Sequence, residues 1–138
     1  MHPGIDYIGV GCGAIVINDN NEVLLVKRSS SSRTEPGMWS RPGGQVEFGE
    51  TVEEAVEREV LEETGVTVKF ERFLCMDQNM GESKHWIALG FLATYVSGRA
   101  QNLEPDKHYA VRWVSLDELP DNLTAYTRHS VDEFISTR

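Results

Sequence analysis

The sequence predicts an α+β fold in which a β-sheet is sandwiched between helices. The chain has 138 residues, about the length of one domain, and shows no repeat and no sign of a second domain. Hydrophobic residues make up 40% and charged residues 25%, which is ordinary for a globular protein. Several strand-like and two helical segments share this short chain, and such elements pack in layers. We therefore expect a single domain over residues 1–138.

The first third of the chain predicts two strands joined by a turn. Residues 8–17 are rich in Val, Ile, Gly and Ala, which indicates a buried strand. Residues 18–21 are a turn cluster and residues 22–28 a second strand, so the two strands are expected to form a hairpin. Residues 29–36 are polar and end in proline, which is typical of a surface loop, and residues 37–42 should be a short extended segment.

The rest of the chain predicts two helices and three further strands. The first helix covers residues 51–64, and its apolar residues recur at helical spacing. The remaining elements are strands at 66–76, 84–96 and 109–114, a helical turn at 116–119 that Pro120 ends, and a helix at 125–137.

Composition excludes several classes of protein. With 22 Asp and Glu against 13 Lys and Arg, the formal net charge is −9, which argues against a protein whose main role is to grip a nucleic acid polymer or an anionic membrane. No apolar run reaches about 18 residues and no signal-peptide pattern is present, so we expect a cytoplasmic protein without a membrane span. Cys12 and Cys75 lack CxxC or CxxH neighbours, which predicts two buried reduced thiols.

The acidity is concentrated in residues 47–63, which hold eight carboxylates and a single base, Arg58. Thr51 and Glu54 match a capping box that starts a helix, and Gly65 stands where a left-handed residue would end it. At about 100° per residue, the helix divides its side chains into three groups. These are an apolar stripe (Val52, Ala55, Val56, Val60), a solvated face (Glu53, Glu54, Glu57) and carboxylates on or beside the stripe (Glu59, Glu62, Glu63).

The three carboxylates beside the stripe predict a metal site. At spacings of i, i+3 and i+4 their side chains converge, and like charges at a partly buried site repel each other. Arg58 can neutralise one of them, and a divalent ion such as Mg²⁺ or Mn²⁺ suits hard oxygen ligands. The competing interpretation is that salt bridges absorb all three charges. Gly43 and Gly44 lie just before the helix, where glycines let the backbone approach a ligand closely.

These residues also match a known motif. Gly44, Glu50 and residues 58–66 (REVLEETGV) fill every fixed position of G-x5-E-x7-R-E-U-x-E-E-x-G-U, so the chain resembles the Nudix hydrolase family. The resemblance implies the Nudix fold, a mixed β-sheet between helices (α/β/α). It also implies a set of site residues: Glu59, Glu62 and Glu63 as metal ligands, the Gly43 carbonyl as a further ligand, Arg58 to orient the carboxylates, Glu50 to support the loop or the metal's water shell, and Glu47 near the metals.

Within the family, the segments at 23–28, 47–50 and 102–107 resemble the MutT-like nucleoside triphosphate pyrophosphatases. This resemblance implies Arg28 as a phosphate contact and Glu104 as an extra metal or substrate residue. Arg41 departs from the apolar residue that relatives often carry, and it either contacts a phosphate or base or points to solvent. A homodimer is plausible by the same analogy.

The aromatic and histidine residues leave two interpretations open. Four aromatic residues either stack on a base or pack in the core: Trp39, Trp86, Trp113 and Tyr109. His85 and His108 either take part in catalysis or occupy polar surface positions.

The resemblance implies hydrolysis of an NTP or dNTP to a nucleoside monophosphate and pyrophosphate. Mg²⁺ would shield the phosphate oxygens and lower the pKa of the attacking water, and Glu62 or Glu63 would take its proton. The alternatives are another diphosphate, such as an NDP-sugar or prenyl diphosphate, a nucleotide-sensing module without catalysis, and a purely structural acidic domain. Sensing modules tend to lose box glutamates, and this chain keeps all of them.

Overall fold

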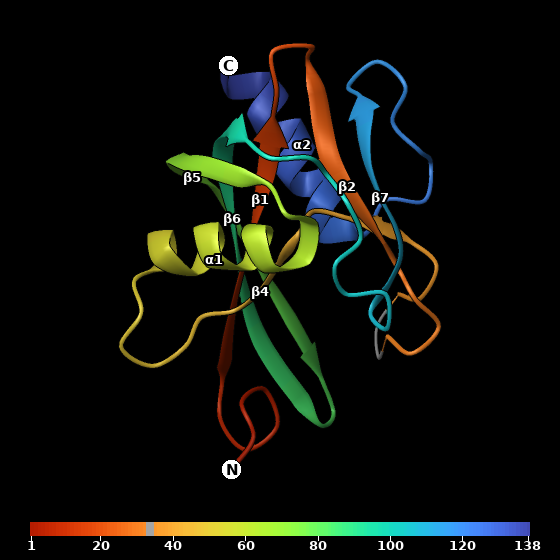
Figure 1. Ribbon diagram of the computed structural model, residues 1–138. Helices are drawn as coiled ribbons and strands as arrows, with labels where there is room; N and C mark the ends of the chain where they lie inside the picture. Colours follow the sequence, from red (N-terminus) through yellow and green to blue (C-terminus); the bar gives the residue numbers. More distant parts are fainter. Residues whose placement is uncertain (33–34) are drawn as a thin grey trace.

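The computed structural model describes residues 1–32 and 35–138, so part of the predicted loop at 29–36 lies outside the described residues. Figure 1 shows α1 crossing the strands on one face. The elements are β1 (Gly9–Ile17), β2 (Glu22–Arg28), β3 (Trp39–Ser40), β4 (Gly43–Gln45), α1 (Val52–Thr64), β5 (Thr67–Gly81), β6 (Lys84–Ser97), β7 (His108–Ser115) and α2 (Ala125–Thr137). Strands β5 and β6 extend further than the sequence predicts. The helical turn predicted at 116–119 is instead a turn at 116–117 followed by a bend.

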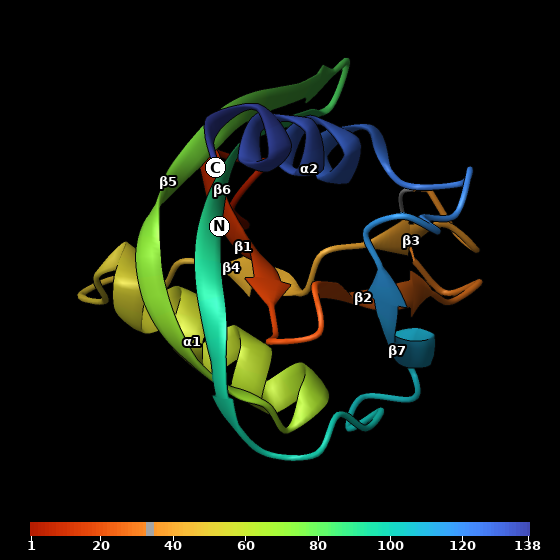
Figure 2. The same ribbon diagram turned by 90° about the horizontal axis from the view of Figure 1, so that it is seen from above.

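The strands form one mixed sheet in the order β3-β2-β1-β6-β5, with β4 paired to β1 and β7 paired to β2. Strands β1 and β6 run parallel, and the other pairs are antiparallel. Helices α1 and α2 lie on opposite faces of this sheet (Figure 2). The predicted α+β fold with a mixed sheet between helices is therefore confirmed.

Alternating side chains on the central strands supply a core to each face. Ala14 and Val16 of β1 pack with α1, whereas Ile15 between them packs with α2. Strand β2 shows the same alternation, with Leu24 in the core on the α1 side and Leu25 on the α2 side. Successive residues of a strand point to opposite faces, so a strand covered on both faces is apolar throughout.

The predicted hairpin of β1 and β2 is present but short. Among the described residues these strands pair only at Ile17 and Val23. Strand β1 pairs with β6 along its whole length and also with β4. Strand β2 pairs with β7 and β3 instead. The two strands therefore diverge beyond this pair.

Helix α1 begins and ends as the sequence predicts. The Thr51 hydroxyl accepts from the Glu54 N–H at 3.1 Å, and the Glu54 carboxylate accepts from the Thr51 N–H at 3.2 Å. Gly65 has φ = 75°, and its N–H donates to the Leu61 carbonyl. Both ends are thus defined by local contacts.

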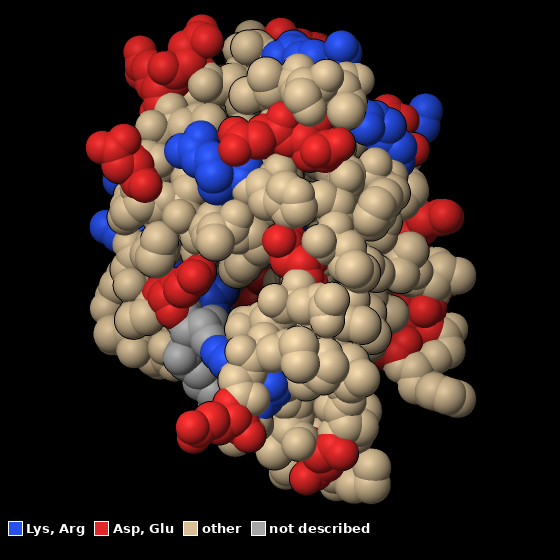
Figure 3. Space-filling view, turned by 180° about the vertical axis from the view of Figure 1, so that it is seen from behind, with Lys and Arg blue, Asp and Glu red and all other residues tan. Residues whose placement is uncertain are grey.

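The two cysteines lie inside the protein. Cys12 and Cys75 are buried free thiols, as expected. No described helix combines the length and apolar character needed to cross a membrane. Figure 3 shows the face opposite α1, where acidic and basic side chains are interspersed rather than gathered into a patch of one sign.

Candidate active site

A cleft of about 940 Å³ lies where β1 and β2 diverge. It is bounded by the glycine-rich segment of β4, the end of α1 and the start of α2. Its lining includes Cys12, Gly13, Arg28, Ser40, Arg41, Gly43, Gly44, Glu63, Asp77, His108 and Tyr126. The motif and the divergent strands thus meet at one concave surface.

Glu63 is the most deeply buried carboxylate of α1, with 5% of its surface exposed. Its Oε2 accepts the Gly43 N–H at 3.0 Å, which joins the end of the helix to the glycine segment. Burial raises the pKa of Glu63 to about 8, and the charges of Glu59 and Glu104 act in the same direction. The helical spacing correctly predicts that this carboxylate lies on the apolar stripe.

Arg58 organises three of the remaining carboxylates. Its Nε donates to Glu50 at 2.6 Å, and its Nη1 donates to Glu59 at 2.8 Å and to Glu62 at 3.2 Å. The hydrogen bond from Arg58 lowers the pKa of Glu50 to about 2. Burial instead raises the pKa of Glu59, even though Arg58 opposes this. One cation therefore serves three carboxylates, whereas Glu63 lies beside His108, with Nε2 3.8 Å from Oε1.

Two glutamates lie further out than the predicted site suggests. The Glu62 side chain is 51% exposed, so it lies on the solvent side of the apolar stripe rather than within it. Glu47 is exposed, and its N–H donates to Glu50 at 3.1 Å. Whether either carboxylate binds a metal stays a prediction.

The donor set fits a hard divalent ion. Glu59 and Glu63 lie against the adjacent glycines Gly44 and Gly43, and both have raised pKa values because burial disfavours their charges. Oxygen ligands with excess negative charge are what Mg²⁺ and Mn²⁺ favour. Among the described contacts, Arg58 pairs with Glu59 and Glu62 but does not reach Glu63.

Gly44 leaves room for the Glu59 carboxylate. A Cβ at this position would lie 2.5 Å from Glu59 Oε2. Because the obstructed group is the end of a flexible side chain, we expect Gly44→Ala to fold but to displace the carboxylate. A displacement of about 1 Å can reduce turnover by about 10²-fold, which steady-state kinetics would measure. Gly81→Ala is the matched control, since its Cβ meets only ordinary contacts at 3.5 Å; equal rates for both variants would contradict this role of Gly44.

Glu104 and His108 join the site from the segment before β7. Ligand atoms of Glu63, Glu104 and His108 all lie within 4.8 Å of one another. In the part of the chain that the structure describes, Glu104 Oε1 and His108 Nδ1 are buried without a hydrogen-bond partner. Burial lowers the pKa of His108, which favours its neutral form. Such buried polar atoms are available to bind a water, an ion or a substrate group.

The surface interpretation of His108 is therefore wrong, because only 7% of this residue is exposed. No local pattern around residue 108 marks it as buried. Its position depends on the pairing of β7 with β2, which is a long-range contact.

The predicted substrate residues differ in their positions. Arg28 lines the cleft and donates to the Tyr126 hydroxyl at 3.1 Å. Arg41 also lines the cleft but does not point to solvent, since it is 5% exposed and donates to the Tyr126 carbonyl and the Ser130 hydroxyl. Burial lowers the pKa of Arg41.

Trp39, predicted as a substrate residue, lies outside the lining of the cleft. It packs against the core on the α2 side, and Lys27 and Arg112 lie 5.9 Å from its ring centroid. Its neighbour Ser40 lines the cleft instead, because adjacent residues of a strand point to opposite sides.

Comparison with known proteins agrees with this geometry. The NUDIX domain family model matches residues 8–134. The NAD-capped RNA hydrolases NudC of Pseudomonas aeruginosa and Haemophilus influenzae are 38% and 34% identical, over 90% and 88% of this chain. The match covers 43% and 46% of those proteins, so the chain spans less than half the length of these curated relatives.

Two solved structures resemble the whole fold. A MutT NUDIX hydrolase from Burkholderia pseudomallei superposes with a TM-score of 0.83 at 38% identity, covering 93% of this chain and 98% of that one. A MutT protein from Methanosarcina mazei gives a TM-score of 0.78 at 32% identity, covering 94% of each chain. The chain therefore belongs to the NUDIX domain family and is of the MutT-like type.

Proposed function

We propose that this protein is a Mg²⁺-dependent hydrolase that cleaves an NTP or dNTP to a nucleoside monophosphate and pyrophosphate, with Mn²⁺ as a substitute metal. The observation that carries the proposal is the position of Glu59 and Glu63, both held against the glycine segment beside the 940 Å³ cleft. The similarity to MutT proteins over nearly the whole of both chains supports the same class of reaction.

In this proposal Glu59, Glu62 and Glu63 hold the metal, and the Gly43 carbonyl is a further ligand. When bound, the divalent ion supplies charge that shields the phosphates and lowers the pKa of the attacking water. Arg58 keeps Glu59 and Glu62 oriented through its Nη1. Glu50 fixes the other side of the guanidinium with two hydrogen bonds.

Other groups act on the substrate itself. Glu62 or Glu63 accepts the proton of the attacking water. Arg28 is at the cleft, where its guanidinium can contact a phosphate. Glu104 lies beside Glu63 and is the candidate for an additional metal or substrate contact.

A second candidate substrate is a dinucleotide diphosphate such as NAD. It is favoured by the 38% identity to a protein named NAD-capped RNA hydrolase NudC. This chain matches less than half the length of that relative. Both candidates share a diphosphate linkage and differ in the product released.

A substrate panel with Mg²⁺ tests the proposal. It includes NTPs, dNTPs, NAD, an NDP-sugar and a prenyl diphosphate, with pyrophosphate, phosphate and mononucleotides quantified separately. We expect the highest kcat/KM with an NTP or dNTP and the release of one pyrophosphate per monophosphate. Cleavage of NAD to two mononucleotides without turnover of NTPs would favour the second candidate. Phosphate release alone, or binding without any turnover, would contradict both.

A further inference from the structure

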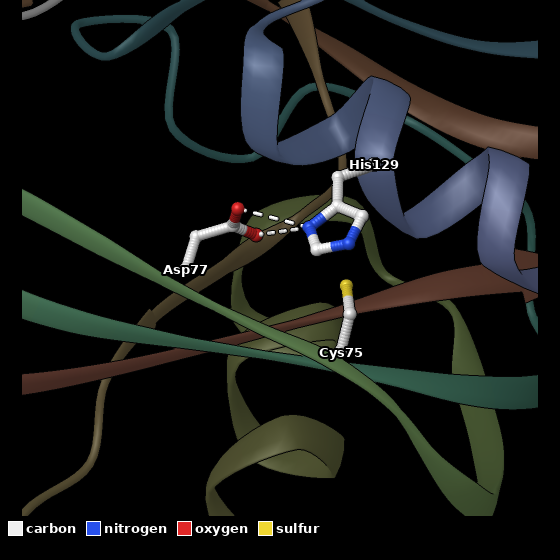
Figure 4. Close-up of side chains that lie close together, drawn as sticks. All are labelled: Cys75, Asp77 and His129. Carbon is white, nitrogen blue, oxygen red and sulfur yellow. Dashed lines mark hydrogen bonds and ion pairs between the residues drawn. The ribbon is translucent and has the colours of Figure 1, made fainter.

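A second group of possible metal ligands lies on the α2 side of the sheet. Cys75 and Asp77 are two residues apart on β5 and point to the same face, where His129 approaches from α2 (Figure 4). One donor atom of each side chain lies within 4.8 Å of the others. His129 Nδ1 is 2.9 and 3.0 Å from the two carboxylate oxygens of Asp77.

We propose that Cys75, Asp77 and His129 bind one Zn²⁺ ion or a similar divalent transition metal. Thiolate, imidazole and carboxylate are the three protein donors that zinc uses, and three such ligands leave a fourth position for water. The sulfur and nitrogen donors distinguish this site from the glutamates of α1, which offer oxygen alone and suit Mg²⁺.

The donor atoms, which lie within 4.8 Å of one another, must adjust their spacing to accept the ion. In a tetrahedral zinc site with bonds of about 2.0–2.3 Å, neighbouring donor atoms lie about 3.3–3.7 Å apart. His129 and Asp77 must therefore separate by a few tenths of an ångström. The His129 side chain is 46% exposed and that of Asp77 31%, so both can shift and solvent can reach the site.

Cys75 has a polar group and a cation near its sulfur. Only 6% of Cys75 is exposed, and its Sγ lies 3.4 Å from the Ser130 hydroxyl. That hydroxyl accepts a hydrogen bond from Arg41 Nη1 at 2.5 Å, so a cation stands beyond it. On binding, the Cys75 thiol gives its proton to solvent, and its thiolate and the Asp77 carboxylate together balance the charge of Zn²⁺.

Cobalt substitution tests this site by a readout other than activity. The full chain is stripped of metal with a chelator and titrated with Co²⁺, which reports thiolate ligands through a sulfur-to-cobalt charge-transfer band in the near ultraviolet. We expect one equivalent of Co²⁺ to produce the band and one equivalent of Zn²⁺ to remove it. Absence of the band at saturating Co²⁺ would overturn the proposal.

Variants assign the ligands. Cys75→Ser should abolish the band, and His129→Ala and Asp77→Asn should each weaken Zn²⁺ binding at least tenfold. His129→Ala keeps the test decisive even if Cys75→Ser fails to fold, because the His129 side chain is largely at the surface. Unchanged Zn²⁺ affinity in His129→Ala would overturn the proposal.

Two controls separate this site from the others. Cys12→Ser should retain the band, and its loss there would assign the thiolate to Cys12 instead. Glu59→Gln should also retain the band, because its carboxylate belongs to the α1 site. The zinc site therefore stands or falls independently of the proposed hydrolase activity.

Discussion

Glu59→Gln should reduce turnover of the best nucleotide substrate by about 10³-fold. A metal ion contributes several kcal/mol of transition-state stabilisation, and each 1.36 kcal/mol corresponds to a factor of ten in rate. Glutamine keeps the size of the side chain but removes the charge that lies beside Gly44 and Arg58. Steady-state kinetics at saturating Mg²⁺ would measure the change in kcat.

Glu53→Gln is the matched control for this substitution. Glu53 belongs to the same helix but lies on its exposed face in the first turn. It should therefore retain a rate close to that of the wild type. If Glu59→Gln were as active as Glu53→Gln, the assignment of the metal site to Glu59 would be wrong.

Glu63→Gln should separate stability from activity. In the metal-free protein, burial raises the pKa of Glu63 from 4.5 to about 8, so the folded state binds a proton that the unfolded state releases between these values. The free energy of unfolding consequently falls as pH rises from 4.5 to 8. Glutamine removes this penalty and can still accept the Gly43 N–H, so we expect a gain of about 5 kcal/mol above pH 8.

Urea denaturation in the presence of EDTA at pH 5 and pH 8 would measure this difference. The gain from Glu63→Gln should be small at pH 5, where Glu63 is protonated in the folded protein, and large at pH 8. The same variant should lose most of its hydrolase activity. A destabilised Glu63→Gln at pH 8, or a gain that does not change with pH, would show that burial does not control this carboxylate.

The part of the site on α1 could be predicted from the sequence because it is local. Thr51 and Gly65 set the ends of the helix through contacts within a few residues. Helical spacing then places Glu63 on the buried side and Glu53 on the exposed side. The glycine segment is the element that comes before α1 in the chain. The contact between Gly43 and Glu63 therefore joins two elements that are consecutive in the sequence.

Long-range pairing decides the parts that the sequence left open or predicted incorrectly. The parallel pairing of β1 with β6 joins residues 77 positions apart in the chain, and no local pattern specifies it. His108 is buried because β7 pairs with β2, and Trp39 faces away from the cleft because Ser40 faces toward it. Cys75 and His129 likewise meet only when α2 packs on β5.

The proposed hydrolase activity is tested most directly by the ratio of its products, measured with and without Mg²⁺. The wild-type chain is incubated with its best NTP or dNTP in Mg²⁺, in parallel with an EDTA-treated sample and with Glu59→Gln. We expect equal amounts of pyrophosphate and nucleoside monophosphate from the wild type and almost none from the other two. Release of phosphate in place of pyrophosphate, or product formation that persists in EDTA, would contradict the proposed hydrolase.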